Sequence, residues 1–271
     1  MPVTKDYIWP GWTTGKLLGR DNLSDIYELE RKVGEREEKA ALKVYAIPKH
    51  ERDIEEMYAE GYDQASVANI LKDYANNIVG EYSRVEKLKD CAYIVGFDDI
   101  RKVPQKNGIG WNVLVKMERL TALPKVLPEE VPEKTVIQVA YMVCAALIEA
   151  HNFGILHQEV KPQNIFLAEN GEYKLGNLGV AGFSQRTTDY VTLADYMFMA
   201  PEIYNNQPHS KTSDIYSLGL VLYWMLNERR LPFVQQIAAG NSVKQAIKQR
   251  LAGNALPEPT IGMFTFASGK K

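Results

Sequence analysis

The first part of the chain alternates apolar and polar residues, and this spacing predicts β-strands. β-Branched and aromatic residues support the prediction, and Pro48 ends the third apolar run. The predicted strands are Trp12–Leu18, Ser24–Lys32, Ala40–Ile47, Ile94–Val103 and Trp111–Glu118. Residues 49–66 are rich in charge, and residues 67–88 place apolar side chains on one helical stripe. The pattern predicts a small antiparallel sheet accompanied by one helix.

Beyond a break near residues 119–124, helical spacing dominates. The predicted helices are Glu133–Phe153, Thr212–Asn227 and Ser242–Leu251. Two short strands, Ile165–Ala168 and Tyr173–Leu175, flank a turn that contains Asn170 and Gly171. The fold class is therefore α+β, with a small sheet-rich lobe followed by a larger, mainly helical lobe.

Composition narrows the class of protein. The chain has 271 residues, of which 45% are hydrophobic and 24% are charged. A chain of this size can bury a large core without a metal or a disulfide. Its net charge of −2 argues against nucleic acid as a partner. Cys91 and Cys144 form neither a disulfide framework nor a zinc spacing.

The chain also lacks the signals of secretion or membrane insertion. No secretory signal opens it. No apolar run reaches the roughly 20 residues that a membrane span needs. We therefore expect a cytoplasmic protein without a membrane segment.

A series of motifs centres on residues 157–164, His-Gln-Glu-Val-Lys-Pro-Gln-Asn, which resemble the catalytic loop of protein kinases. The chain also contains other kinase motifs, before and after this segment, in the order that the family has them: Ala41-Leu-Lys43, Glu81, Gly176-Asn-Leu-Gly179, Met199-Ala-Pro-Glu202 and Ser213–Gly219. The resemblance covers about residues 12–253 and is to serine/threonine kinases of the bacterial, Firmicutes type.

This resemblance implies one kinase-like domain over residues 1–271, with an N-lobe at 1–118, a hinge at 119–123 and a C-lobe at 124–271. Only 271 − 227 = 44 residues follow the helix at 212–227, so we expect the last two helices of the C-lobe to be absent. For the same reason we expect Glu202 to lack the arginine that partners it in the family.

The resemblance also implies an adenine nucleotide site. In the family, the residues at these positions line the adenine pocket or meet the purine edge: Leu18, Ile26, Ala41, Met117, Glu118, Leu120 and Phe166. Lys43 is expected to pair with Glu81, with Glu60 as the alternative partner. Gly19 is the one glycine kept in the phosphate-binding loop, and a carboxylate at Asp21 would repel phosphates. We therefore expect ATP or ADP to bind weakly.

The sequence departs from the family pattern at the positions that, in the family, carry out phosphoryl transfer. Glu159 stands where the family has its catalytic aspartate, while Lys161 and Asn164 match the phosphate-contacting and metal positions. Asn177 replaces the aspartate that holds the metal. Magnesium is normally held by at least one carboxylate, so a site built on the amides of Asn164 and Asn177 is expected to bind it weakly or not at all. Gln158 replaces the arginine that would read a phosphorylated loop.

Four interpretations follow from these departures. The first is a pseudokinase that serves as a binding or regulatory module for an unknown protein partner. The second is an active serine/threonine kinase that uses Glu159 as base on an unknown protein substrate. A small-molecule kinase of the aminoglycoside-phosphotransferase type is disfavoured by Lys161 and the helix of Asp214. An artificially inactivated kinase is disfavoured because several motifs differ at once.

Asp214 lies within an apolar helical run, where a carboxylate must find hydrogen-bond donors. We predict that it is buried and accepts hydrogen bonds from the backbone N–H groups around His157 and Gln158.

Overall fold

The computed structural model describes residues 8–20, 23–106, 108–178, 193–234 and 243–259. The chain divides between Leu120 and Thr121 into two compact units. This division lies inside the segment 119–123 that the sequence singled out. The sheet-rich unit precedes it in the chain, and the mainly helical unit follows it.

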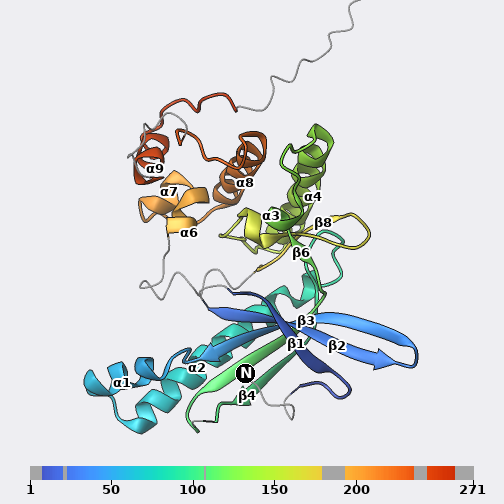
Figure 1. The fold of residues 1–271 in the computed structure, drawn as a ribbon. Coiled ribbons are helices and arrows are strands. Elements are labelled where there is room, and N and C mark those ends of the chain that lie inside the picture. The colour runs from blue at the N-terminus through green and yellow to red at the C-terminus, as the bar shows by residue number, and fades with distance from the viewer. Residues whose placement is uncertain (1–7, 21–22, 107, 179–192, 235–242, 260–271) are drawn as a thin grey trace, which may run out of the picture. The chain divides into compact units, whose positions relative to one another are not determined.

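The sheet-rich unit is built on five antiparallel strands in the order β1-β2-β3-β5-β4 (Figure 1). Their bounds are Thr13–Arg20 (β1), Ser24–Val33 (β2), Arg36–Ile47 (β3), Phe97–Pro104 (β4) and Trp111–Met117 (β5). Strand β4 begins later than the predicted Ile94, because residues 91–94 form a turn in which the Ile94 N–H donates to the Cys91 carbonyl at 3.2 Å. The predicted α+β class, with a five-stranded antiparallel sheet first, is confirmed.

One face of the sheet packs against the long helix α2 (Gln64–Val85), which continues into the short helix η2 (Glu86–Leu88). The hydroxyls of Tyr45 on β3 and Tyr82 on α2 lie 3.0 Å apart in this buried layer. Helix α1 (Glu51–Ala59) precedes α2 and was not predicted. It buries only Ile54, so the sequence offers no apolar stripe by which to recognise it.

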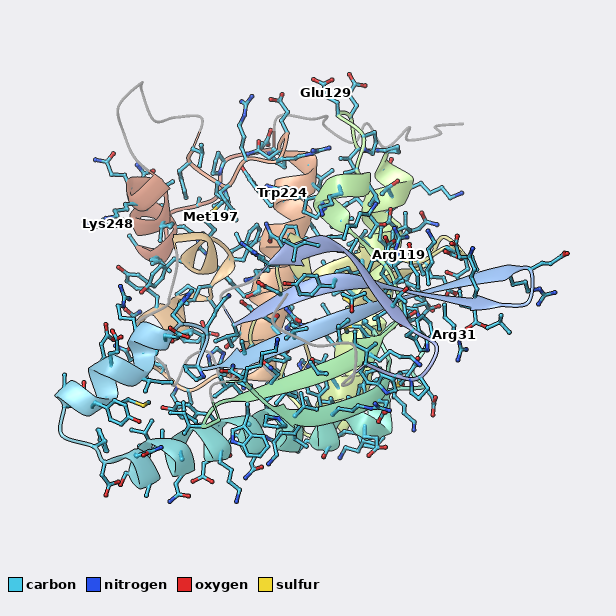
Figure 2. The ribbon with its side chains drawn as sticks, turned by 60° about the horizontal axis from the view of Figure 1, so that its bottom comes forward. Arg31, Arg119, Glu129, Met197, Trp224 and Lys248 are labelled. Carbon is cyan, nitrogen blue, oxygen red and sulfur yellow. The ribbon has the colours of Figure 1, made fainter. Side chains whose placement is uncertain are left out.

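The other face of the sheet is covered by residues that precede β1. Ile8 and Trp9 join an apolar cluster with Leu29, Ala40, Leu42, Val44, Val103 and Leu114. The Trp9 indole N–H donates to Asp99 at 2.5 Å, and the Arg101 guanidinium lies 4.8 Å from the Trp9 ring centre. Arg31 (Figure 2) lies 4.8 Å from the Trp12 ring centre. These contacts bind residues 8–12 to the sheet as a strap.

Replacing Trp9 with alanine is expected to lower the free energy of unfolding by about 2 kcal/mol. A buried tryptophan truncated to alanine costs about 3–5 kcal/mol in a rigid core, and the strap can relax locally to recover part of this. The measurement is urea unfolding of the full chain followed by circular dichroism. The control is Tyr58→Ala, at an exposed site on α1 in the same unit. It is expected to change stability by under about 0.5 kcal/mol.

The helical unit begins with a three-stranded sheet of β6 (Thr121–Ala122), β7 (Ile165–Leu167) and β8 (Tyr173–Leu175). Its helices are α3 (Leu123–Val126), α4 (Glu133–Asn152), η3 (Pro162–Asn164), α6 (Leu193–Phe198), α7 (Pro201–Tyr204), α8 (Lys211–Leu226) and α9 (Val243–Leu251). Helices α4 and α8 pack against each other, and α4 also packs on β8. The three helices predicted for this unit agree closely with α4, α8 and α9. Among the described residues, none of the helices could serve as a membrane span.

Candidate functional site

Five of the predicted nucleotide-site residues meet on one face of the sheet. Strand pairing sets Gly19 opposite Ile26, Ile26 opposite Lys43, and Ala41 opposite Met117. Directly paired residues of neighbouring strands share a face, as do residues two apart on one strand. This register therefore brings Ile26, Ala41, Lys43 and Met117 together on the face that α2 contacts, with Gly19 at the β1 edge.

Lys43 is buried, with 3% of its surface exposed, and its ammonium lies 5.1 Å from the Tyr45 ring centre. The Glu81 carboxylate on α2 binds Arg84, one helical turn later, at 3.1 Å. Glu60, the alternative partner, is exposed at the end of α1. An ion pair between Lys43 and Glu81 stays a prediction.

An ion pair that the sequence did not indicate, between a buried carboxylate and a partly exposed arginine, lies beside these residues. The Arg119 guanidinium nitrogen Nε is 2.7 Å from a carboxylate oxygen of Glu28, whose side chain is 6% exposed. Glu28 lies on β2 opposite Ala41, and Arg119 follows β5. The pair ties the end of β5 to the middle of β2, next to Glu118, whose carboxylate accepts from the Gly96 N–H at 3.0 Å.

The remaining predicted nucleotide-site residues are distributed over both units. Leu18 and Leu120 are half-buried in the sheet-rich unit, and Phe166 is half-buried on β7 of the helical unit. A Cβ added at Gly19 would meet nothing within 4 Å, so the backbone there does not itself require glycine. Asp21 lies outside the described residues.

In the helical unit, the three predicted catalytic residues form one hydrogen-bonded group. The Lys161 ammonium donates to the Glu159 carboxylate at 2.5 Å. The Asn164 side-chain amide donates to the Glu159 carbonyl at 2.8 Å and to its carboxylate at 3.2 Å. The Glu159 carboxylate is therefore held by a cation and by a neutral donor, and a charge-assisted bond of this kind is among the stronger hydrogen bonds.

Asn177 completes this group. Its side-chain amide donates to the Asn164 Oδ1 atom at 2.8 Å. The residue has a φ of +61°. This value lies in the left-handed region, which asparagine adopts more readily than most residues. The oxygen of Asn164 is the atom that could ligate a metal, and here it accepts a hydrogen bond from Asn177.

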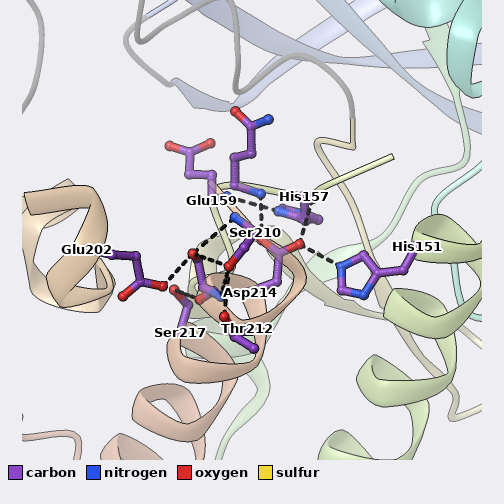
Figure 3. A network of polar contacts seen from close by, with 10 residues as sticks. His151, His157, Glu159, Glu202, Ser210, Thr212, Asp214 and Ser217 are labelled. Atoms are coloured by element: carbon purple, nitrogen blue, oxygen red, sulfur yellow. Dashed lines mark hydrogen bonds and ion pairs between the residues drawn. The ribbon is translucent and has the colours of Figure 1, made fainter. Parts of the chain in front are cut away.

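The loop of residues 157–164 is anchored by Asp214 on α8 (Figure 3). Asp214 is 1% exposed, and its carboxylate accepts from the backbone N–H groups of His157 at 2.9 Å and Gln158 at 2.7 Å. The side chain of His151 on α4 lies 2.8 Å from the same carboxylate. This confirms the prediction for Asp214. The hydrogen bond from the Gln158 N–H to Asp214 also explains how Gln158 keeps a φ of +67°. Such a value is unusual for glutamine.

His157 is fully buried and acts as a structural link. Its Nδ1 atom accepts from the Glu159 N–H at 3.2 Å. The ring proton is therefore on Nε2, because a neutral imidazole carries one proton. Nε2 donates to the Gly176 carbonyl at 2.7 Å. Burial lowers the pKa of His157, and the nearby charge of Asp214 offsets part of this effect. The net lowering favours the neutral ring that these two hydrogen bonds require.

Glu202 was expected to lack an arginine partner. One oxygen of its carboxylate accepts from the Ser213 hydroxyl at 2.5 Å. Ser213 also accepts from the Ser210 N–H at 3.2 Å, within the cap of α8. Because Ser213 and Asp214 are neighbours on α8, one end of this helix holds both the α7 carboxylate and the loop of residues 157–164.

The two predicted metal positions, Asn164 and Asn177, fit magnesium poorly. Magnesium prefers oxygen ligands that include a carboxylate. The two predicted metal positions offer neutral amides, one of them already bonded to the other. Across the described ranges, no three His, Cys, Asp or Glu side chains are grouped so that they could hold a metal ion.

Comparison with known proteins gives a family match over most of the chain. The protein kinase domain profile matches residues 13–260. The MAP kinase kinase MKK1/SSP32 of Saccharomyces cerevisiae is 37% identical over 97 residues, which are 36% of this chain and 19% of that protein. The serine/threonine-protein kinase Nek1 of Mus musculus is 36% identical over 93 residues, 34% of this chain and 8% of that protein.

A probable serine/threonine-protein kinase of Dictyostelium discoideum is 30% identical over 125 residues, 44% of this chain and 13% of that protein. The matched part of the chain thus spans less than a fifth of the length of each of these three relatives.

Proposed function

Since the chain belongs to the protein kinase family, we propose that it is a pseudokinase: a kinase-fold module for binding or regulation. It takes up adenine nucleotide weakly and with little dependence on magnesium. We also propose that residues 1–271 form one kinase-like domain, with its lobes at 1–118 and 124–271 and its hinge at 119–123.

The observation that carries the proposal is the hydrogen bond from Asn177 to Asn164. An aspartate at position 177 would leave two oxygen atoms facing each other, and a cation would be needed to bridge them. The amide of Asn177 supplies an N–H group instead, so the two side chains satisfy each other without a cation. A metal that entered would have to break this bond and would gain no carboxylate from position 177 in return. The neighbouring Glu159 carboxylate already accepts hydrogen bonds from Lys161 and Asn164.

The face shared by Ile26, Ala41 and Met117 supports nucleotide binding. These are apolar residues beside the buried ammonium of Lys43. Such a combination suits a purine ring next to phosphate. Affinity would come mainly from apolar contact and from the backbone groups of Glu118 and Leu120. Without a metal to neutralise charge, a triphosphate gains less than it does in the intact family site.

One observation favours the alternative, an active serine/threonine kinase. Glu159 keeps a carboxylate that Lys161 and Asn164 hold in place, as a general base requires. It is one methylene longer than aspartate, and a displacement of about 1 Å can cost about a hundredfold in rate. We place this function second for that reason.

A nucleotide titration of the full chain, read by thermal shift with and without Mg²⁺, tests the proposal. We expect adenosine, ADP and ATP to shift the melting temperature by similar small amounts, and added Mg²⁺ to change the apparent Kd by less than about threefold. A parallel autophosphorylation assay is expected to show no transfer. Tight binding of ATP that requires Mg²⁺ would contradict the argument from Asn177, and transfer at about 1–100 s⁻¹ would establish the active kinase instead.

We also propose the bacterial type of the kinase-like domain and its cellular compartment. The charged segment before α2 and the ending Asn227-Glu-Arg-Arg-Leu-Pro-Phe233 support a bacterial, Firmicutes-type kinase. Neither Cys91 nor Cys144 forms a disulfide, which supports a cytoplasmic site of action. We propose that the partner which this module binds or regulates is a protein.

A further inference from the structure

Arg250 on α9 is a buried cation that the family resemblance does not explain. Only 4% of its surface is exposed. Its guanidinium donates to the carbonyl of Met199 at 2.7 Å, to the carbonyl of Tyr196 at 2.9 Å and to the Tyr216 hydroxyl at 3.3 Å. One side chain of α9 therefore binds three places: Tyr196 on α6, Met199 between α6 and α7, and Tyr216 on α8.

No carboxylate lies within ion-pair distance of this guanidinium in the part of the chain that the structure describes. Burial lowers the pKa of Arg250, partly offset by Tyr216. Three acceptors offset the cost of burying the charge. The Tyr216 ring, whose centre lies 5.7 Å away, adds to this. Leucine at this position of α9 would fill the same space without the free-energy cost of burying a charge. The arginine is therefore expected to have a specific geometric role.

The segment that Arg250 grips is also fixed at two further points. The Glu202 carboxylate of α7 is held by Ser213 of α8. The rings of Tyr196 on α6 and Tyr204 on α7 meet edge to face, with centres 5.9 Å apart. Residues 196–204 are thus tied to α8 and α9 through their backbone as well as their side chains.

We propose that Arg250 is a positioning residue that holds the α6–α7 segment, residues 196–204, in one fixed conformation. The cation that orders the segment comes from α9, and its guanidinium donates to two backbone carbonyls of the segment and to the Tyr216 hydroxyl of α8. The conformation of the segment is therefore set by contacts with α8 and α9.

This inference goes beyond the proposed function and is tested without nucleotide. Arg250→Ala is expected to raise the amide hydrogen-exchange rate of peptides covering 196–204 about tenfold or more, while α4 peptides change less than about twofold. The fork of the guanidinium matters as well as its charge, so Arg250→Lys is expected to give an intermediate increase. Lys248→Ala, an exposed cation on the same helix (Figure 2), is the matched control and is expected to leave exchange unchanged.

A rescue experiment separates positioning from simple core packing. Free guanidinium at millimolar concentration is expected to restore part of the protection of 196–204 in Arg250→Ala, and to do nothing for the Lys248→Ala control. The proposal is overturned if exchange in Arg250→Ala rises equally in α4 and in 196–204, or if it does not rise at all. Arg250→Met provides the same test in a variant that keeps the apolar stem, should the alanine variant fail to fold.

Discussion

Replacing Asp214 with alanine is expected to lower the free energy of unfolding of the helical unit by about 3–5 kcal/mol. Its carboxylate is the acceptor for the N–H groups of His157 and Gln158, and it also meets the ring of His151. Removing it leaves buried donors unpaired, and each costs about 1–3 kcal/mol. The positive φ of Gln158 would also lose its tether.

Urea unfolding of the full chain, followed by circular dichroism, measures this loss. Asp214→Asn keeps the volume and one acceptor oxygen, so it is expected to fall between the wild type and the alanine variant. Ser217→Ala, one turn along α8, removes only a hydroxyl that bonds back to the Ser213 carbonyl. This control is expected to cost under about 1 kcal/mol. Equal stability of the Asp214→Ala variant and the wild type would mean that the loop is held by other contacts.

Most of the fold was predictable because its elements bury regular apolar faces. The strands of the sheet, α2, α4 and α8 show a period of two or of 3.6 residues, and the structure contains each of them. Asp214 was predictable for a related reason. A lone carboxylate in an apolar helix must have donors, and the neighbouring motif indicated which backbone groups those are.

Features that depend on contacts distant in sequence could not be predicted in the same way. The strap of residues 8–12 covers the sheet through Ile8 and Trp9, which join an apolar cluster whose other members lie on β2, β3, β4 and β5. The pair of Glu28 and Arg119 joins residues far apart along the chain. Arg250 left a weaker signal, because it falls on the face of α9 that carries the buried residues Ala246 and Ile247. A cation on a buried helix face is a reason to look for acceptors.

The candidate site divides in the same way. The residues Glu159, Lys161 and Asn164 were identified from local spacing, and the structure brings them together. The bond between Asn177 and Asn164 depends on the path of the chain between them through β7 and β8, which brings position 177 back beside η3. Sequence alone indicated a loss of charge at position 177. The structure adds that the replacing amide is itself bonded to the neighbouring ligand position.

Asn177→Asp is expected to make nucleotide binding depend on magnesium. A carboxylate cannot donate to the Asn164 oxygen, so the existing bond is lost, at about 0.5–1.5 kcal/mol, and two acceptors face each other. A divalent cation relieves that arrangement and brings its own attraction to phosphate. We expect the apparent Kd for ADP or ATP to fall at least about tenfold on adding Mg²⁺ to this variant, where the wild type changes less than about threefold. Isothermal titration calorimetry of the full chain measures both values.

Two controls decide whether charge or the lost bond is responsible. Asn177→Ala removes the bond without adding charge and is expected to stay insensitive to Mg²⁺. Asn206→Asp makes the same chemical change at an exposed asparagine with a similar φ of +57° and is expected to behave as the wild type does. If Mg²⁺ strengthens binding in the wild type as much as in Asn177→Asp, the hydrogen-bonded amides do not replace the cation. Adding Glu159→Asp to Asn177→Asp is expected to bring detectable phosphoryl transfer, since a correctly placed base contributes about 10²–10⁴ in rate.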